Sequence, residues 1–189
     1  AAVGLPYKEG LDAAMRGTSG ESERILLRQF YGPDCDPDAI HRSLMQVADR
    51  EFAGKVPKKP GLDELLAWLD SQHLPMAVAS SSPRRMITHH LEVWGLTHYF
   101  KAIASGEDVV DSKPNPEIFL RAAAKLGTPP AHTLVLEDSY NGVRAGAAGG
   151  FVTVMVPDLS PANDEMRRLY TAECPSLYAV LDKLKTGEL

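Results

Sequence analysis

The stretch LVLEDSYNGVRAGAAGG, residues 134–150, says most about the fold. Its apolar beginning predicts a buried strand that ends in two adjacent carboxylates, Glu137 and Asp138. The turn and the Ala/Gly-rich run that follow predict a helix able to pack close to a sheet. Open α/β sheets bind their ligands at the carboxyl ends of the strands, where these acids would lie. The pair either caps the following helix or, because two neighbouring charges are costly to bury without a cation, binds Mg²⁺.

Two further segments also lead from an extended or loop conformation into a helix. An apolar run ends in Ser80, Ser81 and Ser82, and Pro83 then suits the first helical position. Hydroxyls and free backbone N–H groups at such a turn favour a phosphate site, although many helices begin with Ser-Pro. In the other segment, the following Pro114 keeps Lys113 out of a helix. A lysine fixed there can neutralise a phosphoryl group, whereas most single lysines are simply solvated.

The order of the three segments resembles motifs two, three and four of the haloacid dehalogenase superfamily, in its β-phosphoglucomutase and sugar-phosphatase branch. The matching stretches are VASSS (78–82), SKPNPEIF (112–119) and LEDSYNGVRAG (136–146). This resemblance implies that Ser80 hydrogen-bonds the transferring phosphoryl group. It implies that Lys113 balances the charge of that group and positions the nucleophile. It also implies that Asp138 holds Mg²⁺, with Glu137 as a further ligand or as support behind Asp138.

The first motif of that superfamily, DxDx[TV], carries the nucleophilic and acid/base aspartates, and it has no match upstream of Ser80. The segment Asp34-Cys35-Asp36-Pro37 has the spacing, but it lies in a turn with no apolar strand before it. We therefore expect that a strand, a loop and a helix, about 25–30 residues together, precede the sequence. In the resembled fold that strand lies between the strands that end at Ser80 and Glu137.

The pattern changes from helical to alternating near residues 56 and 57. Alternating helices and strands predict a parallel sheet with right-handed crossovers. We expect an α/β protein with a Rossmann-like parallel core of the haloacid dehalogenase type at residues 57–189 and a small helical cap domain at residues 1–56. The expected helices span 8–16, 21–31, 37–52, 61–72, 83–94, 116–126, 141–149 and 176–184, and the expected strands span 75–79, 102–104, 133–137 and 151–156.

Substrate selection is expected from the cap, whose first loop faces the core in the resembled family. The residues expected to bind substrate are Arg16, Thr18 and Ser19 of this loop, together with Ser81 and Ser82. Arg16 is equally well explained as a cation at a helix end, where it would interact with the helix dipole.

The resemblance also bears on the type of reaction. The phosphoglucomutase pattern has cations at two positions that are Gly20 and Pro83 here, which favours a phosphatase over a mutase. Arg84 and Arg85 are close enough in sequence to substitute, but a solvated first helical turn explains them better. We expect a Mg²⁺-dependent phosphomonoesterase that acts on a sugar or polyol phosphate through an aspartyl-phosphate. A sugar phosphomutase, and an inactive phosphate-binding module if the first strand is truly lacking, are the alternatives.

Composition agrees with an enzyme that acts on small molecules. The 189 residues carry a net charge of −5 and no evident basic face, so nucleic acid is not an expected partner. The two cysteines, Cys35 and Cys174, lack the spacing of a disulfide framework or zinc site. No apolar run is long enough to span a bilayer, and no membrane association is expected. We expect a cytoplasmic monomer.

Overall fold

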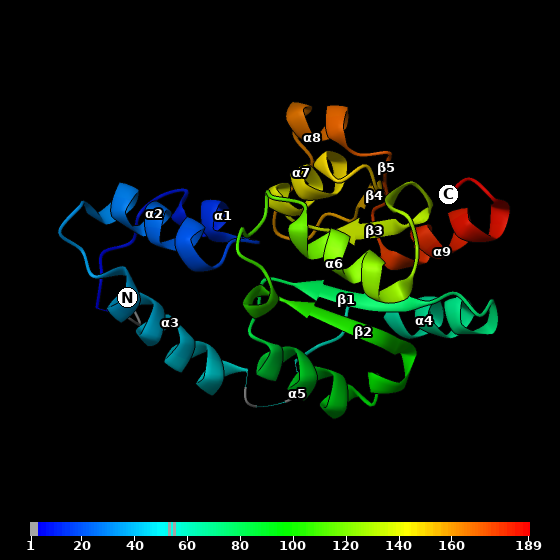
Figure 1. Cartoon of the computed structure of the whole chain (residues 1–189), viewed down its shortest axis with the longest axis horizontal. Helices are drawn as coiled ribbons and strands as arrows, with labels where there is room; N and C mark the ends of the chain where they lie inside the picture. Colours follow the sequence, from blue (N-terminus) through cyan, green and yellow to red (C-terminus); the bar gives the residue numbers. More distant parts are fainter. Residues whose placement is uncertain (1–3, 53, 55) are drawn as a thin grey trace.

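Three helices pack against one another at one end of the molecule (Figure 1). The computed structural model describes residues 4–52, 54 and 56–189. The three helices are α1 (Leu11–Met15), α2 (Gly20–Tyr31) and α3 (Pro37–Glu51). Helix α3 begins as expected, with Pro37 at its first position and the Asp36 carboxylate accepting backbone N–H groups of its first turn. Helix α1 is shorter than expected because Gly10, in a left-handed conformation, precedes it.

The rest of the chain alternates helices with parallel strands, which confirms the expected α/β, Rossmann-like fold. The strands are β1 (Met76–Ser80), β2 (Phe100–Ser105), β3 (Leu134–Glu137), β4 (Val152–Met155) and β5 (Ala172–Glu173). The helices are α4 (Leu62–Ser71), α5 (Arg84–Trp94), α6 (Glu117–Leu126), α7 (Tyr140–Ala148), α8 (Asp164–Leu169) and α9 (Leu177–Thr186). Short 3-10 helices are η1 (Thr97–Tyr99), η2 (Gly106–Asp108) and η3 (Pro130–His132).

The parallel strands form two sheets rather than one. Strand β1 pairs with β2, and β3, β4 and β5 pair in that order. Among the described residues, no strand pairs with the second edge of β1 or of β3. These are the strands that end at Ser80 and Glu137, between which the resembled fold has its first strand. Unpaired backbone groups at such edges cost free energy wherever water cannot reach them.

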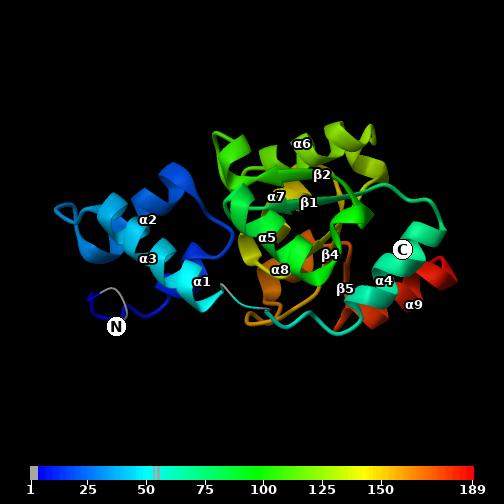
Figure 2. The ribbon, with the colours of Figure 1, turned by 90° about the horizontal axis from the view of Figure 1, so that it is seen from below.

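Helices bridge the two sheets. Helix α6 packs on β1 and β2, and its Phe119 belongs to the same buried cluster as Val135 of β3. Helix α4 lies beside α9 (Figure 2), where its Leu65 joins a cluster with Val154 of β4. The neighbouring Leu66 of α4 packs in the cluster that contains residues of β1. The helices therefore join the two sheets through buried hydrophobic contacts, although among the described residues no strand of one sheet pairs with a strand of the other.

Helix α7 lies very close to β3 and β4, as its Ala/Gly-rich sequence predicts. A Cβ added at Gly142 would overlap the carboxylate of Glu137, and one added at Gly146 would overlap the side chain of Thr153. Gly142 therefore lets the first turn of α7 sit directly on the end of β3, and Gly146 lets the following turn pack against β4.

Division into a cap domain at residues 1–56 and a core at residues 57–189 stays a prediction. Residues 1–3, 53 and 55 of the expected cap lie outside the described residues. Within the described part of the chain, no helix is both long and apolar enough to cross a membrane.

Candidate active site

The ends of β1 and β3 meet under the loop between α1 and α2. The hydroxyl of Ser81, directly after β1, donates to the carbonyl oxygen of Gly17 at 2.6 Å. The same glycine lies against the turn after β3, because an added Cβ would stand 3.0 Å from Oγ of Ser139. The same added Cβ would stand 3.5 Å from Cδ of Lys113. The three segments singled out in the sequence therefore converge at one edge of the molecule.

The centre of the site is a buried ion pair between Lys113 and Glu137. Lys113 is only 4% exposed and Glu137 only 9%. The Lys113 ammonium donates a hydrogen bond to Oε1 of the Glu137 carboxylate. The other carboxylate oxygen accepts the backbone N–H groups of Asp138 and Ser139, each at 3.0 Å, and the Ser139 hydroxyl at 2.9 Å. The ammonium also lies 4.6 Å from the centre of the Phe119 ring. Since both of its oxygens are engaged, Glu137 suits a supporting role better than direct metal ligation.

Asp138 is the acid that faces solvent. Its side chain is exposed, but the protein around it partly shields the carboxylate from water. This shielding and the adjacent charge of Glu137 raise the pKa of Asp138 above its ordinary value. The neighbouring Asp158, which pairs with Lys59, adds to the rise. A cation at Asp138 would relieve this concentration of negative charge.

The donor set fits Mg²⁺ rather than a metal held by protein ligands alone. Among the described residues, no group of three or more histidine, cysteine, aspartate or glutamate side chains is arranged to hold a metal. Mg²⁺ typically takes one or two carboxylates and completes its shell with water and substrate phosphate oxygens. One exposed carboxylate at Asp138, supported by Glu137, matches this coordination preference.

The serines at the end of β1 and directly after it have different hydrogen-bond partners. Oγ of Ser80 accepts the backbone N–H of Ser82 at 3.2 Å, which orients its hydroxyl. The Ser81 hydroxyl is occupied by the loop of the helical segment. Helix α5 begins at Arg84, one residue later than expected, with Pro83 at the N-cap position.

The expected substrate-binding residues of the α1–α2 loop have different surroundings. The Arg16 guanidinium pairs with Asp12 at 2.9 Å and donates to Oγ of Ser160, in the loop after β4. The Thr18 hydroxyl donates back to the carbonyl oxygen of Met15 at 2.8 Å. Ser19 lies near the end of β2, where a Cβ on Gly106 would stand 3.1 Å from its Oγ. The loop thus contacts the core at several strand ends.

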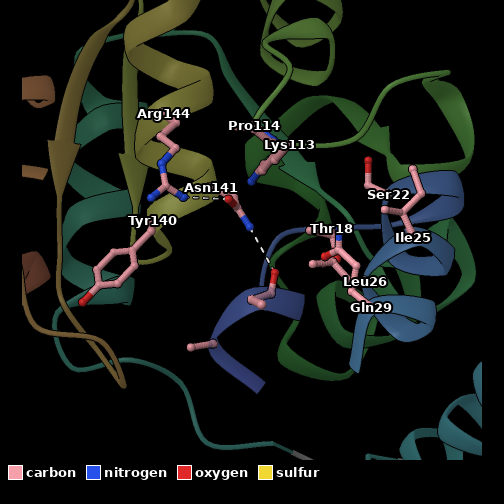
Figure 3. Close-up of a pocket in the computed structure, with 12 residues that line it drawn as sticks. Thr18, Ser22, Ile25, Leu26, Gln29, Lys113, Pro114, Tyr140, Asn141 and Arg144 are labelled. Carbon is pink, nitrogen blue, oxygen red and sulfur yellow. Dashed lines mark hydrogen bonds between the residues drawn. The ribbon is translucent and has the colours of Figure 1, made fainter. Parts of the chain in front are cut away.

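A pocket of about 460 Å³ lies between the helical segment and the core (Figure 3). Lys113 and Asn141 form part of its core wall, and α2 supplies much of the facing wall. The full lining is Ala13, Ala14, Thr18, Ser22, Ile25, Leu26, Gln29, Lys113, Pro114, Tyr140, Asn141 and Arg144. Ser22 and Gln29 were missed from the sequence, although their spacing of seven residues predicts one face of a helix.

Fold and site together define an α/β protein whose polar centre lies at the carboxyl ends of parallel strands, beneath a helical segment. Residues 6–156 match the family of haloacid dehalogenase-like hydrolases. The chain belongs to this family, which confirms the resemblance seen in its motifs.

Individual relatives agree with that assignment. The chain is 39% identical to hexitol phosphatase B of Escherichia coli K12 over 129 residues, covering 65% of this chain and 58% of the relative. It is 32% identical to a fructose-1-phosphate phosphatase of the same organism over 153 residues, covering 81% and 80%. A solved hydrolase from Pseudomonas syringae shares the fold, with a TM-score of 0.82, 23% identity and coverage of 96% of this chain and 84% of that one. The chain spans 55–64% of the length of the first curated relatives it matches.

Proposed function

We propose that this protein is a Mg²⁺-dependent phosphomonoesterase that hydrolyses a small sugar or polyol phosphate. The observation that carries the proposal is the buried Lys113–Glu137 ion pair, followed directly in the chain by the exposed, charge-crowded Asp138 at the end of β3. A fixed ammonium in the same site as an acid with a raised pKa suits a ligand that brings both a phosphoryl group and a metal. The names of the relatives, which include hexitol and fructose-1-phosphate phosphatases, support the same class of substrate.

Each polar group has a distinct role in this proposal. The Ser80 hydroxyl, oriented by the N–H of Ser82, donates to a phosphoryl oxygen. Lys113 balances the charge of the phosphoryl group, and Glu137 holds the ammonium in place. Asp138 holds Mg²⁺, which neutralises charge on the phosphoryl oxygens when bound.

We assign the nucleophile to an aspartate on a strand between β1 and β3. The support is topological, because these two strands each have an unpaired edge among the described residues. A strand there would end between Ser80 and Glu137, within reach of the phosphoryl site. Attack of its carboxylate on phosphorus would break the bond to the ester oxygen, which takes up a proton and leaves as the alcohol of the sugar or polyol. Water would then hydrolyse the aspartyl-phosphate to inorganic phosphate and the free aspartate.

The pocket between α2 and the core is the proposed site for the substrate's carbon chain. Its polar groups on α2, Ser22 and Gln29, suit a ligand rich in hydroxyls. Its apolar wall, which includes Leu26, suits the carbon skeleton. A pocket of this size is typical of small-molecule sites.

Mutase chemistry is the weaker alternative because the two candidate cations for a second phosphate are engaged elsewhere. Arg84 bonds the carboxylate of Asp108 at 2.5 Å. Arg85 makes a two-pronged ion pair with Asp49 of α3, at 2.6 and 3.0 Å. Neither guanidinium is directed to the site, which favours release of phosphate over its return to the sugar.

The test is release of inorganic phosphate by the intact enzyme from a panel of hexitol, hexose and pentose phosphates. We expect release that depends on Mg²⁺ and falls by about 100-fold or more in Lys113→Met, since a preorganised charge at the transferring group is lost. Lys58→Met, which removes a surface lysine paired with Asp63, is the matched control and should stay active. Release that persists in EDTA, or interconversion of β-glucose 1-phosphate and glucose 6-phosphate faster than release, would contradict the proposal.

A further inference from the structure

We propose that Ser81 and Asn141 are positioning residues that dock the α1–α2 loop over the active site. The docking geometry stands on the structure alone, and only its kinetic consequence rests on the proposed function. Ser81 follows a strand of one sheet, and Asn141 follows a strand of the other. The docked loop therefore contacts both halves of the core.

Both side chains donate to main-chain carbonyls of one short segment, residues 14–17. Ser81 follows β1 and donates to the carbonyl oxygen of Gly17 at 2.6 Å. Asn141 lies in the first turn of α7, after β3, and its Nδ2 donates to the carbonyl oxygens of Arg16 at 3.0 Å and Ala14 at 3.3 Å. Figure 3 shows the Asn141 amide directed from the core toward this segment.

The accepting carbonyls lie at the end of helix α1, where the last turn of any helix leaves carbonyl groups without helical partners. Here Ser81 and Asn141 of the core donate hydrogen bonds to such carbonyl oxygens. Because main-chain carbonyls are present whatever side chains the loop carries, docking depends on the donors at Ser81 and Asn141.

The orientation of the Asn141 amide is fixed by its other neighbour. Its Oδ1 accepts from the Arg144 guanidinium at 2.9 Å, and that guanidinium is held by two bonds of 2.6 Å to Glu165. A guanidinium can only donate, so the oxygen must face Arg144 and the NH₂ group must face the loop. The donor is therefore preorganised before the loop arrives.

The docked loop packs closely against one side of the buried ion pair. Gly17 has a φ of 78°, and a Cβ on it would stand 3.0 Å from Oγ of Ser139 and 3.5 Å from Cδ of Lys113. Docking at this distance shields the side of the Lys113–Glu137 pair that faces Gly17 from water. Exclusion of water strengthens the electrostatic interactions of both groups. Loss of docking should therefore lower kcat more than it raises KM.

Hydrogen–deuterium exchange of the intact enzyme tests the docking directly. The variants are Ser81→Ala, and Asn141→Asp, which keeps an oxygen for Arg144 but removes the donor. Each should exchange the amides of residues 16–19 about fivefold faster than wild type, as expected for the loss of one hydrogen bond. Ser81→Thr, which keeps a hydroxyl, should restore slow exchange.

The matched control is Ser43→Ala, which removes a hydroxyl bonded to the carbonyl of Ala39 within α3. It should leave exchange in the loop unchanged. Wild-type exchange in both Ser81→Ala and Asn141→Asp, or equal acceleration in Ser43→Ala, would overturn the docking role.

Kinetics on the same proteins separate this inference from the proposed function. Faster loop exchange together with a kcat that falls more than KM rises supports both. Faster loop exchange in an enzyme that releases no phosphate from any substrate supports docking and defeats the proposed function. Unchanged exchange in variants of an active phosphatase defeats docking alone.

Discussion

Two adjacent acids, Glu137 and Asp138, have opposite electrostatic surroundings. The carboxylate of Glu137 is matched by the Lys113 ammonium and by three N–H or O–H donors. The negative charge of Asp138 is not compensated in this way. Its raised pKa shows that the folded protein disfavours the ionised form of this carboxyl group. A site built to receive a cation would show this pattern, because the missing positive charge arrives with the ligand.

Replacing Asp138 tests whether that charge is held for a metal. Without Mg²⁺, Asp138→Asn should raise the melting temperature at neutral pH, since it removes an unfavourable charge. Because the folded-state pKa is raised, wild type carries this penalty above that pKa and loses it as the pH falls through it. The gain in the variant should therefore shrink at acidic pH, as measured by thermal melts across a pH series.

The same melts with Mg²⁺ added complete the test of Asp138. Mg²⁺ should stabilise wild type and Asp70→Asn, an exposed aspartate of α4, but not Asp138→Asn. Equal stabilisation of all three proteins would remove Asp138 from the metal site.

Gly142 controls how closely α7 approaches Glu137. Gly142→Ala places a methyl group where the Glu137 carboxylate lies, so either the helix or the ion pair must move. We expect a loss of about 1–3 kcal/mol in the free energy of unfolding, measured in urea, which is typical of overpacking at a tight site. Gly54→Ala is the control, since no atom lies within 4 Å of its added Cβ. Equal stability of the two variants would contradict the tight packing of α7.

Single residues differed in how well the sequence revealed them. The acids after β3 and the lysine before Pro114 were recognisable because their types and neighbours suit one chemistry. Asn141 was not, because an Asn-Gly pair ordinarily signals only a turn. Its contact with the loop joins residues more than 120 positions apart, a distance over which local patterns carry no information.

Helices and strands were predictable where the sequence marks their ends. Helices α5 and α6 stop at Gly95 and Gly127, both of which adopt left-handed conformations that few other residues tolerate. Helix α8 and the two-residue strand β5 were missed because elements this short have no measurable periodicity. Strand β5 exists through its pairing with β4, which is a tertiary contact.

The carboxylate of Asp108, in the turn after β2, joins this turn to the start of α5. Asp108 accepts from Arg84 at 2.5 Å and from the backbone N–H and hydroxyl of Ser105 at 2.7 and 3.0 Å. These bonds, led by the one from Arg84, hold the pKa of Asp108 well below its usual range. Asp108→Asn should lower the free energy of unfolding at neutral pH by about 1–3 kcal/mol, through loss of charge-assisted hydrogen bonds.

The pH dependence of the Asp108 effect gives an independent check. A depressed folded-state pKa stabilises the protein above the unfolded pKa and loses this effect as the pH falls. The stability difference between wild type and Asp108→Asn should thus shrink below about pH 4, the usual range of an unfolded aspartate. A difference that urea titrations find constant from neutral to acidic pH would contradict the ion pair.

Across the whole molecule, the site assembles from parts that are separate in sequence and in the sheets. The strand ends supply Ser80 and Asp138, a loop supplies Lys113, and the loop between α1 and α2 lies against Ser81 and Lys113. The α/β class followed from the alternation of elements. The split between β1 and β3 and the docking of the loop required the structure, since both depend on which segments meet in space.

A crystal structure of the intact enzyme with Mg²⁺ and a phosphonate analogue of a hexitol phosphate would show directly whether Ser80, Lys113 and Asp138 bind the phosphoryl group and the metal. We expect phosphonate oxygens within hydrogen-bonding distance of Oγ of Ser80 and Nζ of Lys113, and Mg²⁺ coordinated by Asp138. We expect the polyol chain in the pocket beside Ser22 and Gln29. A phosphonate bound away from Lys113, or Mg²⁺ bound without Asp138, would contradict the proposed site.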